Sequence, residues 1–485
     1  MQRHYVIGLD VGTTGTKAVV ADECGTVYGK GYNEYDLIFG ENGSVTQRPD
    51  DWFDAACYAI RIAVSESNLD PRKIEAISLS TQGASMLAVG RNFEPLCDAI
   101  TWMDKSTGAE VSELCAGIGE ERLYRKSGWP LGCANDAPKI LWLRKNRPDI
   151  FNSAGSFVST LEYMNFRMTG NNVTDPSNAA IRSLMNIGEG KYDSEILDFI
   201  GIGEDKLPKL QRAGSYVGKL TAEAASLFGL TQEVSVINGA HDQYCASIGS
   251  GAVSAGDMLV ATGTAWVLLG ISDRLIYTPS RACPGIHPAD GLYGVMASLV
   301  SAGSALKWFR GICSTDYAEL DRGAATHRES ARNLFFGPYL SGGAFPHGNT
   351  VPKAEISGLE LSHDKYDIAL ALMEGVGFEV KTALAEYERF GCTAGKLMMT
   401  GRTAHSDVWR GIVRDITGRE ILVTDEADTC CVGAAIIAAV GAGIYPSFAQ
   451  AADAMVKISE HDIPVRENTE FYNEKYKRYM EKFPV

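Results

Sequence analysis

The sequence has no excess of basic residues. Its 45 Lys and Arg stand against 60 Asp and Glu, which gives a formal net charge of −15 at pH 7. Because affinity for a phosphate backbone comes mainly from cationic side chains, a surface of this sign disfavours nucleic acid. We therefore predict no nucleic acid among the partners of this protein.

Long apolar runs are also missing. The longest ones, such as residues 430–440, are too short and too rich in Ala and Gly to span a bilayer. We therefore predict no membrane partner.

The 11 cysteines show no repeated close spacing. An odd number of scattered cysteines in a long chain predicts reduced thiols and a cytoplasmic location. The adjacent pair Cys430 and Cys431 lies in a stretch that reads as the start of a helix. We interpret both as small packing residues rather than as a redox or ligand site.

What the chain does have is enough length and apolar content for several domains. At 485 residues, with 45% hydrophobic and 22% charged residues, it is typical of globular proteins of two to four domains. Strand-like and helix-like stretches alternate along the chain, and this predicts an α/β fold.

The opening of the chain predicts a phosphate-binding hairpin. An apolar run, 5–9, ends on Asp10, a Gly/Thr-rich turn follows, and a second apolar run covers 18–21. P-loops and dinucleotide loops open a helix, whereas this turn opens a second strand. Anion contacts would therefore come from backbone N–H groups of the turn itself.

Side chains of the turn extend this hypothesis. Thr13, Thr14 and Thr16 would add hydroxyl donors, and Lys17 would add a positive charge. Asp10, at the end of the strand, is placed to hold a metal-bound water near the same phosphates. The alternative is an ordinary solvated hairpin, although five Gly or Thr residues are an unusual composition for a plain turn.

A second hairpin repeats this plan at 258–269, with Ala261 at the position that Asp10 has in the first. Two such hairpins half a chain apart predict two domains of related topology that face each other across a cleft. The pattern places the boundary between them at about residues 246–255.

A second candidate site is the stretch 239–243, where a predicted strand delivers Asp242 just before a helix. Ligands of α/β sheets bind at such strand ends, and a carboxylate there could accept a proton from an attacking hydroxyl. A helix N-cap is an equally good reading of Asp242 from the pattern alone. His241 is better read as a packed loop residue than as a metal ligand, because no second His or Cys lies at ligand spacing.

Further motifs follow in order along the chain. They are residues 99–104, 138–143, 174–179, 261–264, 303–308, 338–342, 370–377 and 429–438. Together with the opening turn and the stretch 239–243, they resemble the FGGY carbohydrate kinases, xylulokinase-like members included, of the actin and hexokinase superfamily. The resemblance covers nearly the whole chain.

The resemblance implies an α/β fold of two actin-like (ribonuclease H-like) domains with a central cleft. Residues 1–248 would bind the sugar and carry the catalytic base, and residues 249–485 would bind the nucleotide. ATP and Mg²⁺ are the implied cofactors, and a small sugar or polyol is the implied substrate. A homodimer is compatible with this picture.

The resemblance also implies roles for single residues. Asp242 would be the general base and Asp10 would organise Mg²⁺. The implied nucleotide contacts are Thr13, Thr14, Lys17, Thr262, Gly263, Gly303, Gly401 and Arg402. The implied sugar contacts are Gln82, Trp102, Asp104 and Gln243.

The chain departs from the family pattern at three places. Arg402 and Thr403 stand where the family has glycines on the adenine side, which leaves the nucleotide preference open. The stretch 81–83 reads Thr-Gln-Gly where xylulokinase-like members commonly have Met-His-Gly. The stretch 338–346 lacks two polar groups of the family's Pro-Tyr-Leu-Ser-Gly-Glu-Arg-Thr-Pro pattern.

The predicted reaction is ATP-dependent phosphorylation of a sugar hydroxyl, with a ketopentose such as xylulose as the first choice. Gluconate, glycerol, erythritol or a deoxy-sugar stay open as acceptors. The sequence is also compatible with a non-kinase ATPase on the same scaffold and with an inactive regulator. Trp102 and Asp104 favour the kinase, because an ATPase without an acceptor has no use for sugar contacts.

Overall fold

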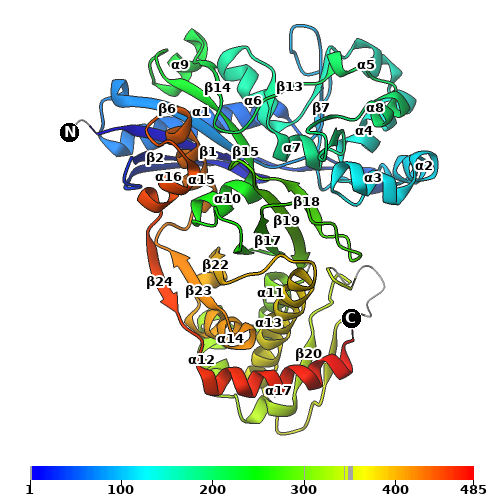
Figure 1. The fold of residues 1–485 in the computed structure, drawn as a ribbon, viewed down its shortest axis with the longest axis vertical. Helices are drawn as coiled ribbons and strands as arrows, with labels where there is room; N and C mark the ends of the chain where they lie inside the picture. The colour runs from blue at the N-terminus through cyan, green and yellow to red at the C-terminus, as the bar shows by residue number, and fades with distance from the viewer. Residues whose placement is uncertain (1–2, 300, 343–344, 348–352, 485) are drawn as a thin grey trace. The chain divides into compact units, whose positions relative to one another are not determined.

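The computed structural model describes residues 3–299, 301–342, 345–347 and 353–484 (Figure 1). The chain divides into two compact units. The first unit comprises Met1–Val253, Cys283–Gly294 and Asp428–Val456, and the second comprises Ser254–Ala282, Val295–Ala427 and Lys457–Val485.

The first unit is built on a six-stranded sheet of order β14-β15-β6-β1-β2-β3. Its strands are β1 (Tyr5–Val11), β2 (Gly15–Asp22), β3 (Val27–Glu34), β6 (Ile74–Thr81), β14 (Tyr216–Lys219) and β15 (Ser235–His241). β1 pairs antiparallel with β2 and parallel with β6, and β6 pairs parallel with β15. The predicted strand–turn–strand opening is therefore confirmed, and β3 continues it as a third strand.

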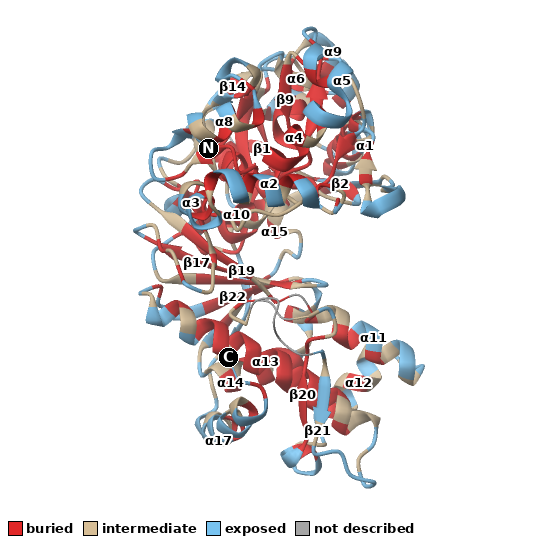
Figure 2. Ribbon diagram, turned by 90° about the vertical axis from the view of Figure 1, so that its right-hand side faces the viewer, coloured by how far each residue is buried: buried red, intermediate tan, exposed pale blue. Residues whose placement is uncertain are grey.

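Helices cover both faces of this sheet, so β1 is buried on both sides (Figure 2). On one face, α1 (Pro49–Ser67) shares a core with alternate residues of β1 and β2. On the other face lie α10 (Asp242–Gly249) and α15 (Thr429–Gly441). A strand buried on both faces reads as a continuous apolar run, as the sequence of β1 does.

Shorter elements complete the first unit. The strands are β4 (Ile38–Phe39), β5 (Val45–Gln47), β7 (Leu87–Val89), β8 (Ala99–Ile100), β9 (Ser156–Val158), β10 (Val173–Thr174), β11 (Met185–Asn186), β12 (Lys191–Tyr192), β13 (Lys209–Leu210) and β18 (Cys283–Ile286). The helices are α2 (Gly108–Ile118), α3 (Glu120–Ser127), α4 (Asp136–Asn146), α5 (Pro148–Ser153), α6 (Thr160–Thr169), α7 (Pro176–Ile181), α8 (Ser194–Ile200), α9 (Ala222–Phe228) and α16 (Phe448–Met455).

In the second unit, six strands follow one another in the order β19-β17-β16-β22-β23-β24 and repeat this plan, within a sheet of seven strands that also includes β18. Its strands are β16 (Asp257–Thr262), β17 (Trp266–Ser272), β19 (Tyr293–Leu299), β22 (Lys396–Thr400), β23 (Glu420–Thr424) and β24 (Ile458–Asp462). β16 pairs antiparallel with β17 and parallel with β22, as β1 does with β2 and β6. The two units therefore have related topologies, as the paired hairpins predicted.

The helices of the second unit are α11 (Gly303–Cys313), α12 (Tyr317–Ala324), α13 (Lys365–Arg389), α14 (Asp407–Thr417) and α17 (Arg466–Lys482). Two further strands, β20 (Phe335–Gly337) and β21 (Glu355–Ser357), pair antiparallel in a small sheet of their own. α13 is largely buried and contributes much of the hydrophobic core (Figure 2). Within the described part of the chain, every helix is too short or too polar to cross a membrane.

The compact units differ from the predicted domains, 1–248 and 249–485, in a boundary that follows Val253 and in two later segments. Residues 283–294 and 428–456 cluster with the first unit. For the later segment the reason is close packing, because Gly433 of α15 leaves no room for a side chain against the carbonyl oxygen of Cys245 in α10. The assignment of sugar and nucleotide to separate domains stays a prediction.

Candidate active site

Three parallel strands of the first unit end at one edge of the sheet. In register, Val11 of β1 is level with Thr81 of β6, and Thr81 with His241 of β15. The carboxyl ends of parallel strands are where α/β sheets hold ligands. This edge brings together Asp10, Gln82 and Asp242, which are far apart in the sequence.

Asp10 lies just below this edge, with Oδ1 accepting a hydrogen bond of 2.7 Å from the Ser80 hydroxyl. Burial raises the pKa of Asp10 to about 7, although the bond from Ser80 opposes this and the charge of Asp242 adds to it. Asp10 is thus a partly buried carboxylate near a second carboxylate, and a bound cation would stabilise such a site.

The turn between β1 and β2 is closed by a hydrogen bond of 3.0 Å from the Gly12 N–H to the Gly15 carbonyl. Among the described residues, no partner accepts from the backbone N–H groups of Thr13 and Thr14. Successive N–H groups without partners form an anion-binding nest. Two successive N–H groups of the turn are therefore available as donors, and their contact with an anion stays a prediction.

Lys17, the predicted phosphate contact beside this turn, is engaged elsewhere. Its Nζ lies 2.6 Å from Oδ1 of Asp428, at the start of α15. A contact of Lys17 with phosphate would have to compete with this ion pair, so that role stays a prediction.

Asp242 is the first residue of α10, and the residue at the N-cap is His241. Oδ1 of Asp242 lies 3.3 Å from Nε2 of His241, and the Asp242 side chain is partly exposed. No capping hydrogen bond from a side chain is present at this helix. The helix-cap reading of Asp242, which the sequence left open, therefore does not describe this carboxylate.

The other predicted sugar contacts also belong to the first unit. Trp102 is exposed and donates from its indole N–H to the Thr13 hydroxyl at 3.0 Å. Gln82 is buried, and Gln243 has a buried amide oxygen for which the described residues offer no partner.

Asp104 has a structural role that its motif did not predict. It is buried, and its carboxylate accepts hydrogen bonds from the N–H of Val45 at 2.9 Å and from the N–H and hydroxyl of Ser106 at 2.8 and 2.7 Å. These bonds occupy much of the capacity of the carboxylate, and its contact with a sugar stays a prediction.

The second unit contains a pocket of about 610 Å³. Its lining includes four of the residues predicted to bind the nucleotide, namely Thr262, Gly263, Gly303 and Arg402. The volume is within the range of small-molecule sites.

Two glycines, one in the lining of this pocket and one next to it in sequence, allow close approaches between backbone segments. A Cβ at Gly303 would lie 2.2 Å from the carbonyl oxygen of Gly263, so α11 starts directly against the β16–β17 turn. Gly401 has φ +89°, and a Cβ there would lie 2.7 Å from the carbonyl oxygen of Thr262. Only glycine fits these positions without a shift of the backbone.

Thr262 has its hydroxyl hydrogen engaged, because Oγ1 donates to the Thr400 carbonyl at 2.6 Å and so links β16 to β22. Its predicted contact with a phosphate could therefore not come from this O–H.

The pocket also carries charged residues that motif reasoning missed. Lys307 and Arg310 of α11 line it with Arg402, and Asp321 accepts a hydrogen bond of 2.7 Å from Ser406. Lys307 and Arg310 follow Gly303 by four and seven residues, which is helical spacing for one face. That spacing was the available signal in the sequence.

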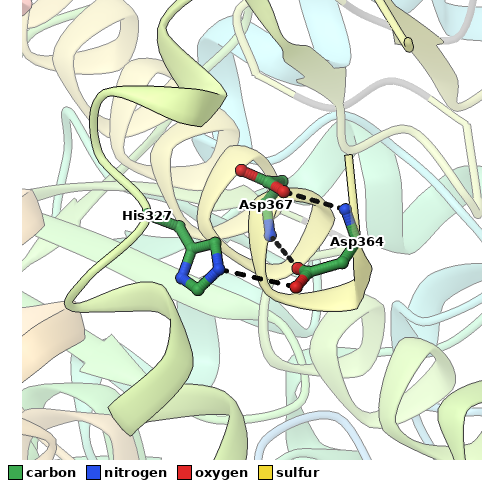
Figure 3. A group of neighbouring side chains, drawn as sticks. All are labelled: His327, Asp364 and Asp367. Atoms are coloured by element: carbon green, nitrogen blue, oxygen red, sulfur yellow. Dashed lines mark hydrogen bonds and ion pairs between the residues drawn. The ribbon is translucent and has the colours of Figure 1, made fainter. Parts of the chain in front are cut away.

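A group of His and Asp side chains lies elsewhere in the second unit, made of His327, Asp364 and Asp367 (Figure 3). Asp364 and Asp367 form a capping box at the start of α13, and His327 Nε2 lies 3.5 Å from Asp364 Oδ2. The capping bonds account for this geometry without a metal ion.

Comparison with known proteins gives a consistent result. The profile described as the FGGY family of carbohydrate kinases, N-terminal domain, matches residues 5–249, and the profile of the C-terminal domain matches residues 258–442. Xylulose kinase of Bacillus subtilis (strain 168) is 27% identical over 483 residues, which are 98% of this chain and 96% of that protein. Gluconokinase of the same organism is 27% identical over 482 residues, which are 96% and 93% of the two chains.

Among solved structures, a ligand-bound xylulose kinase from Lactobacillus acidophilus superposes with a TM-score of 0.91 at 26% identity, covering 99% of this chain and 97% of that one. Two units of common topology, one with an acidic strand edge and the other with a glycine-lined pocket, define a carbohydrate kinase of actin-like fold. The chain belongs to the FGGY family of carbohydrate kinases.

Proposed function

We propose that the protein transfers the γ-phosphoryl group of ATP to a hydroxyl of a small sugar, with Asp242 as the general base. The observation that carries this proposal is the carboxylate of Asp242, which lies at the carboxyl edge of β15 and is not used to cap α10. A carboxylate there can accept the proton of a bound hydroxyl.

In this reaction Asp242 takes the hydroxyl proton while the hydroxyl oxygen bonds to the γ-phosphorus. The bond from that phosphorus to the β,γ-bridging oxygen breaks, and ADP leaves with the electron pair. General-base assistance of this kind contributes roughly 10²- to 10⁴-fold in rate. The N–H groups of Thr13 and Thr14 would bind phosphate oxygens as negative charge moves between them.

Asp10 is the residue that fits a role toward Mg²⁺. Its carboxylate oxygens are ligands or water acceptors of the kind that Mg²⁺ prefers, and burial beside Asp242 disfavours its charge when no cation is near. When bound, Mg²⁺ would neutralise part of the charge on the phosphates. Ser80 fixes the orientation of the Asp10 carboxylate through its 2.7 Å hydrogen bond.

The pocket of the second unit is the proposed nucleotide site. Its three cations, Lys307, Arg310 and Arg402, suit the phosphates of ATP, since charge-assisted hydrogen bonds to phosphate are strong. Arg402 stands where the family pattern has a small residue. We therefore assign to Arg402 a direct contact with a phosphate or with the ribose.

For the acceptor, a ketopentose such as xylulose stays the first choice, and the similarity to xylulose kinases over nearly the whole chain supports it. An aldonate such as gluconate is the second candidate. The observation in its favour is that gluconokinase of Bacillus subtilis is equally similar, at 27% identity.

The test is ADP formation by the purified protein with MgATP, alone and with a panel of ketopentoses, aldoses, polyols and aldonates. We expect turnover that depends on one acceptor class and a phosphorylated product that mass spectrometry detects. ATP hydrolysis that no member of the panel stimulates would overturn the proposal.

A further inference from the structure

Gln47, at the end of β5, is buried and contacts three groups of the first unit (1% exposed). Its Nε2 lies 2.6 Å from the carbonyl oxygen of Thr13 in the β1–β2 turn. Its Oε1 lies 3.1 Å from the indole nitrogen of Trp52 and 3.0 Å from Nε2 of Gln82. No motif of the sequence singled out Gln47.

The chemistry of these neighbours fixes the orientation of the Gln47 amide. An indole N–H can only donate, so the Gln47 atom that faces Trp52 must be the oxygen. A backbone carbonyl can only accept, so the atom that faces Thr13 must be the nitrogen. Both neighbours therefore require the same orientation of the Gln47 amide, and a flipped amide would lose both hydrogen bonds.

The orientation of the Gln47 amide also determines that of the Gln82 amide. Because Gln47 presents an oxygen, the Gln82 atom that faces it must be the NH₂ group, which donates. Oε1 of Gln82 then points away from Gln47, and it is a buried acceptor without a hydrogen-bond partner among the described residues. An unpaired buried acceptor is costly, so a ligand that donates to it would gain affinity.

The position of Gln82 indicates that the ligand donating to its Oε1 is the acceptor sugar. Gln82 directly follows β6, and its backbone N–H donates to the Val11 carbonyl at 2.9 Å, at the strand edge that carries Asp10 and Asp242. A Cβ at the next residue, Gly83, would lie 2.6 Å from the imidazole of His241, the neighbour of Asp242. Gln82 is thus part of the edge where the acceptor hydroxyl must meet its base.

We propose that Gln47 is a positioning residue that holds the Gln82 amide so that Gln82 Oε1 accepts a hydrogen bond from a hydroxyl of the sugar. The proposal rests on the function proposed above and specifies its substrate. The group at Gln82 must carry a hydrogen-bond donor, so a hydroxyl fits there, whereas a carboxylate or a carbonyl would face the Gln82 oxygen unfavourably. A ketose or polyol carbon bearing OH is favoured at this position over the acid end of an aldonate.

The test compares the best natural acceptor with its monodeoxy analogues, one hydroxyl removed at a time. For the wild type, we expect one analogue to lose at least about tenfold in kcat/KM, because a site built for a hydroxyl rejects the analogue without it. In Gln82→Met and in Gln47→Met, the full acceptor should lose affinity, and its advantage over that analogue should fall to within about twofold. In the double variant the loss should match that of Gln82→Met alone, because residues acting through one contact are not additive.

Gln47→Glu separates orientation from packing. Glu keeps an oxygen for Trp52 and Gln82 in either protonation state, so the preference for the hydroxyl should persist there. Gln211→Met is the matched control, since Gln211 donates to the carbonyl of Tyr216 at 2.7 Å in the same unit, and it should leave the preference unchanged.

The outcomes separate the two proposals. If the wild type phosphorylates no acceptor, the proposed function fails and this inference fails with it. If the wild type is active but the losses of Gln47→Met and Gln82→Met multiply in the double variant, or if Gln47→Glu loses the preference as Gln47→Met does, the positioning role alone is overturned.

Discussion

At the residue scale, the carboxylate of Asp242 stands at the first position of α10 and makes no capping hydrogen bond. In Asp242→Asn the side chain keeps its size but cannot accept the hydroxyl proton. We expect kcat to fall by roughly 10²- to 10⁴-fold, with little change in the KM for ATP. Steady-state kinetics with the best acceptor measure this, with the melting temperature as the control for folding. A kcat near that of the wild type would show that another group is the base.

Asp10 lies near the end of β1, which β6 separates from β15 in the sheet, and its removal should have a different effect. In Asp10→Asn the partly buried side chain loses the charge that favours a cation, while its bond with Ser80 can persist. We expect the Mg²⁺ concentration for half-maximal rate to rise by at least about tenfold, since charge-assisted contacts are about twice as strong as neutral ones. The KM for the sugar should change much less. A Mg²⁺ titration at saturating ATP and sugar measures this change. An unchanged Mg²⁺ requirement would show that Asp10 does not contribute to Mg²⁺ binding.

Residue types at strand ends were readable from the sequence, but hydrogen-bond partners were not. The apolar runs that end in Asp10 and before Asp242 predicted both carboxylates at the sheet edge, and the structure places them there. Asp104 and Thr262 matched family motifs equally well. Their hydrogen bonds to Val45 and Thr400, however, come from segments distant in sequence, and no local spacing encodes them.

At the element scale, the same limit applies to α15. Its small apolar residues predicted a helix, and the helix forms at Thr429–Gly441. Its place in the first unit was not predictable from local pattern, because it depends on three close approaches. A Cβ at Gly8, Gly249 or Gly433 would lie 1.9 Å from a backbone oxygen of the helix or strand it faces.

These approaches make one glycine substitution a sharp test of the packing. In Gly433→Ala the new Cβ would meet the Cys245 carbonyl, so α10 and α15 must separate. We expect a destabilisation of about 1–3 kcal/mol or more, as for overpacked cores. Gly411→Ala in α14 is the control, because the only atom near its Cβ is the end of the Arg414 side chain at 3.7 Å. That change should stabilise by about 0.5–1 kcal/mol, since Ala is the better helix former. Equal melting temperatures for the two variants would contradict the packing described for α15.

At the scale of the whole molecule, the proposed ligands belong to different units. The strand edge with Asp242 lies in the first unit, and the pocket with Arg402 lies in the second. Each unit has its own sheet and its own hydrophobic core, so unfolding need not be a single transition. Substitutions in the pocket should therefore change nucleotide binding while leaving acceptor recognition intact.

Arg402→Ala tests this separation and the unusual residue in the pocket together. Loss of a guanidinium that contacts phosphate or ribose should weaken ATP by about tenfold, the effect of a charge-assisted hydrogen bond of about 1.4 kcal/mol. At an ATP concentration of about 100 times the wild-type Kd, ATP should stabilise the wild type by about 2.7 kcal/mol and the variant by about 1.4 kcal/mol. Thermal melts with and without ATP measure this difference, and the KM for the sugar should stay within about twofold of the wild-type value.

Arg322→Ala is the control of equal charge, because Arg322 is an exposed residue of α12 outside the pocket lining. If Arg322→Ala weakened ATP as much as Arg402→Ala, the effect would come from net charge; if Arg402→Ala left ATP binding unchanged, Arg402 would make no contact with the nucleotide.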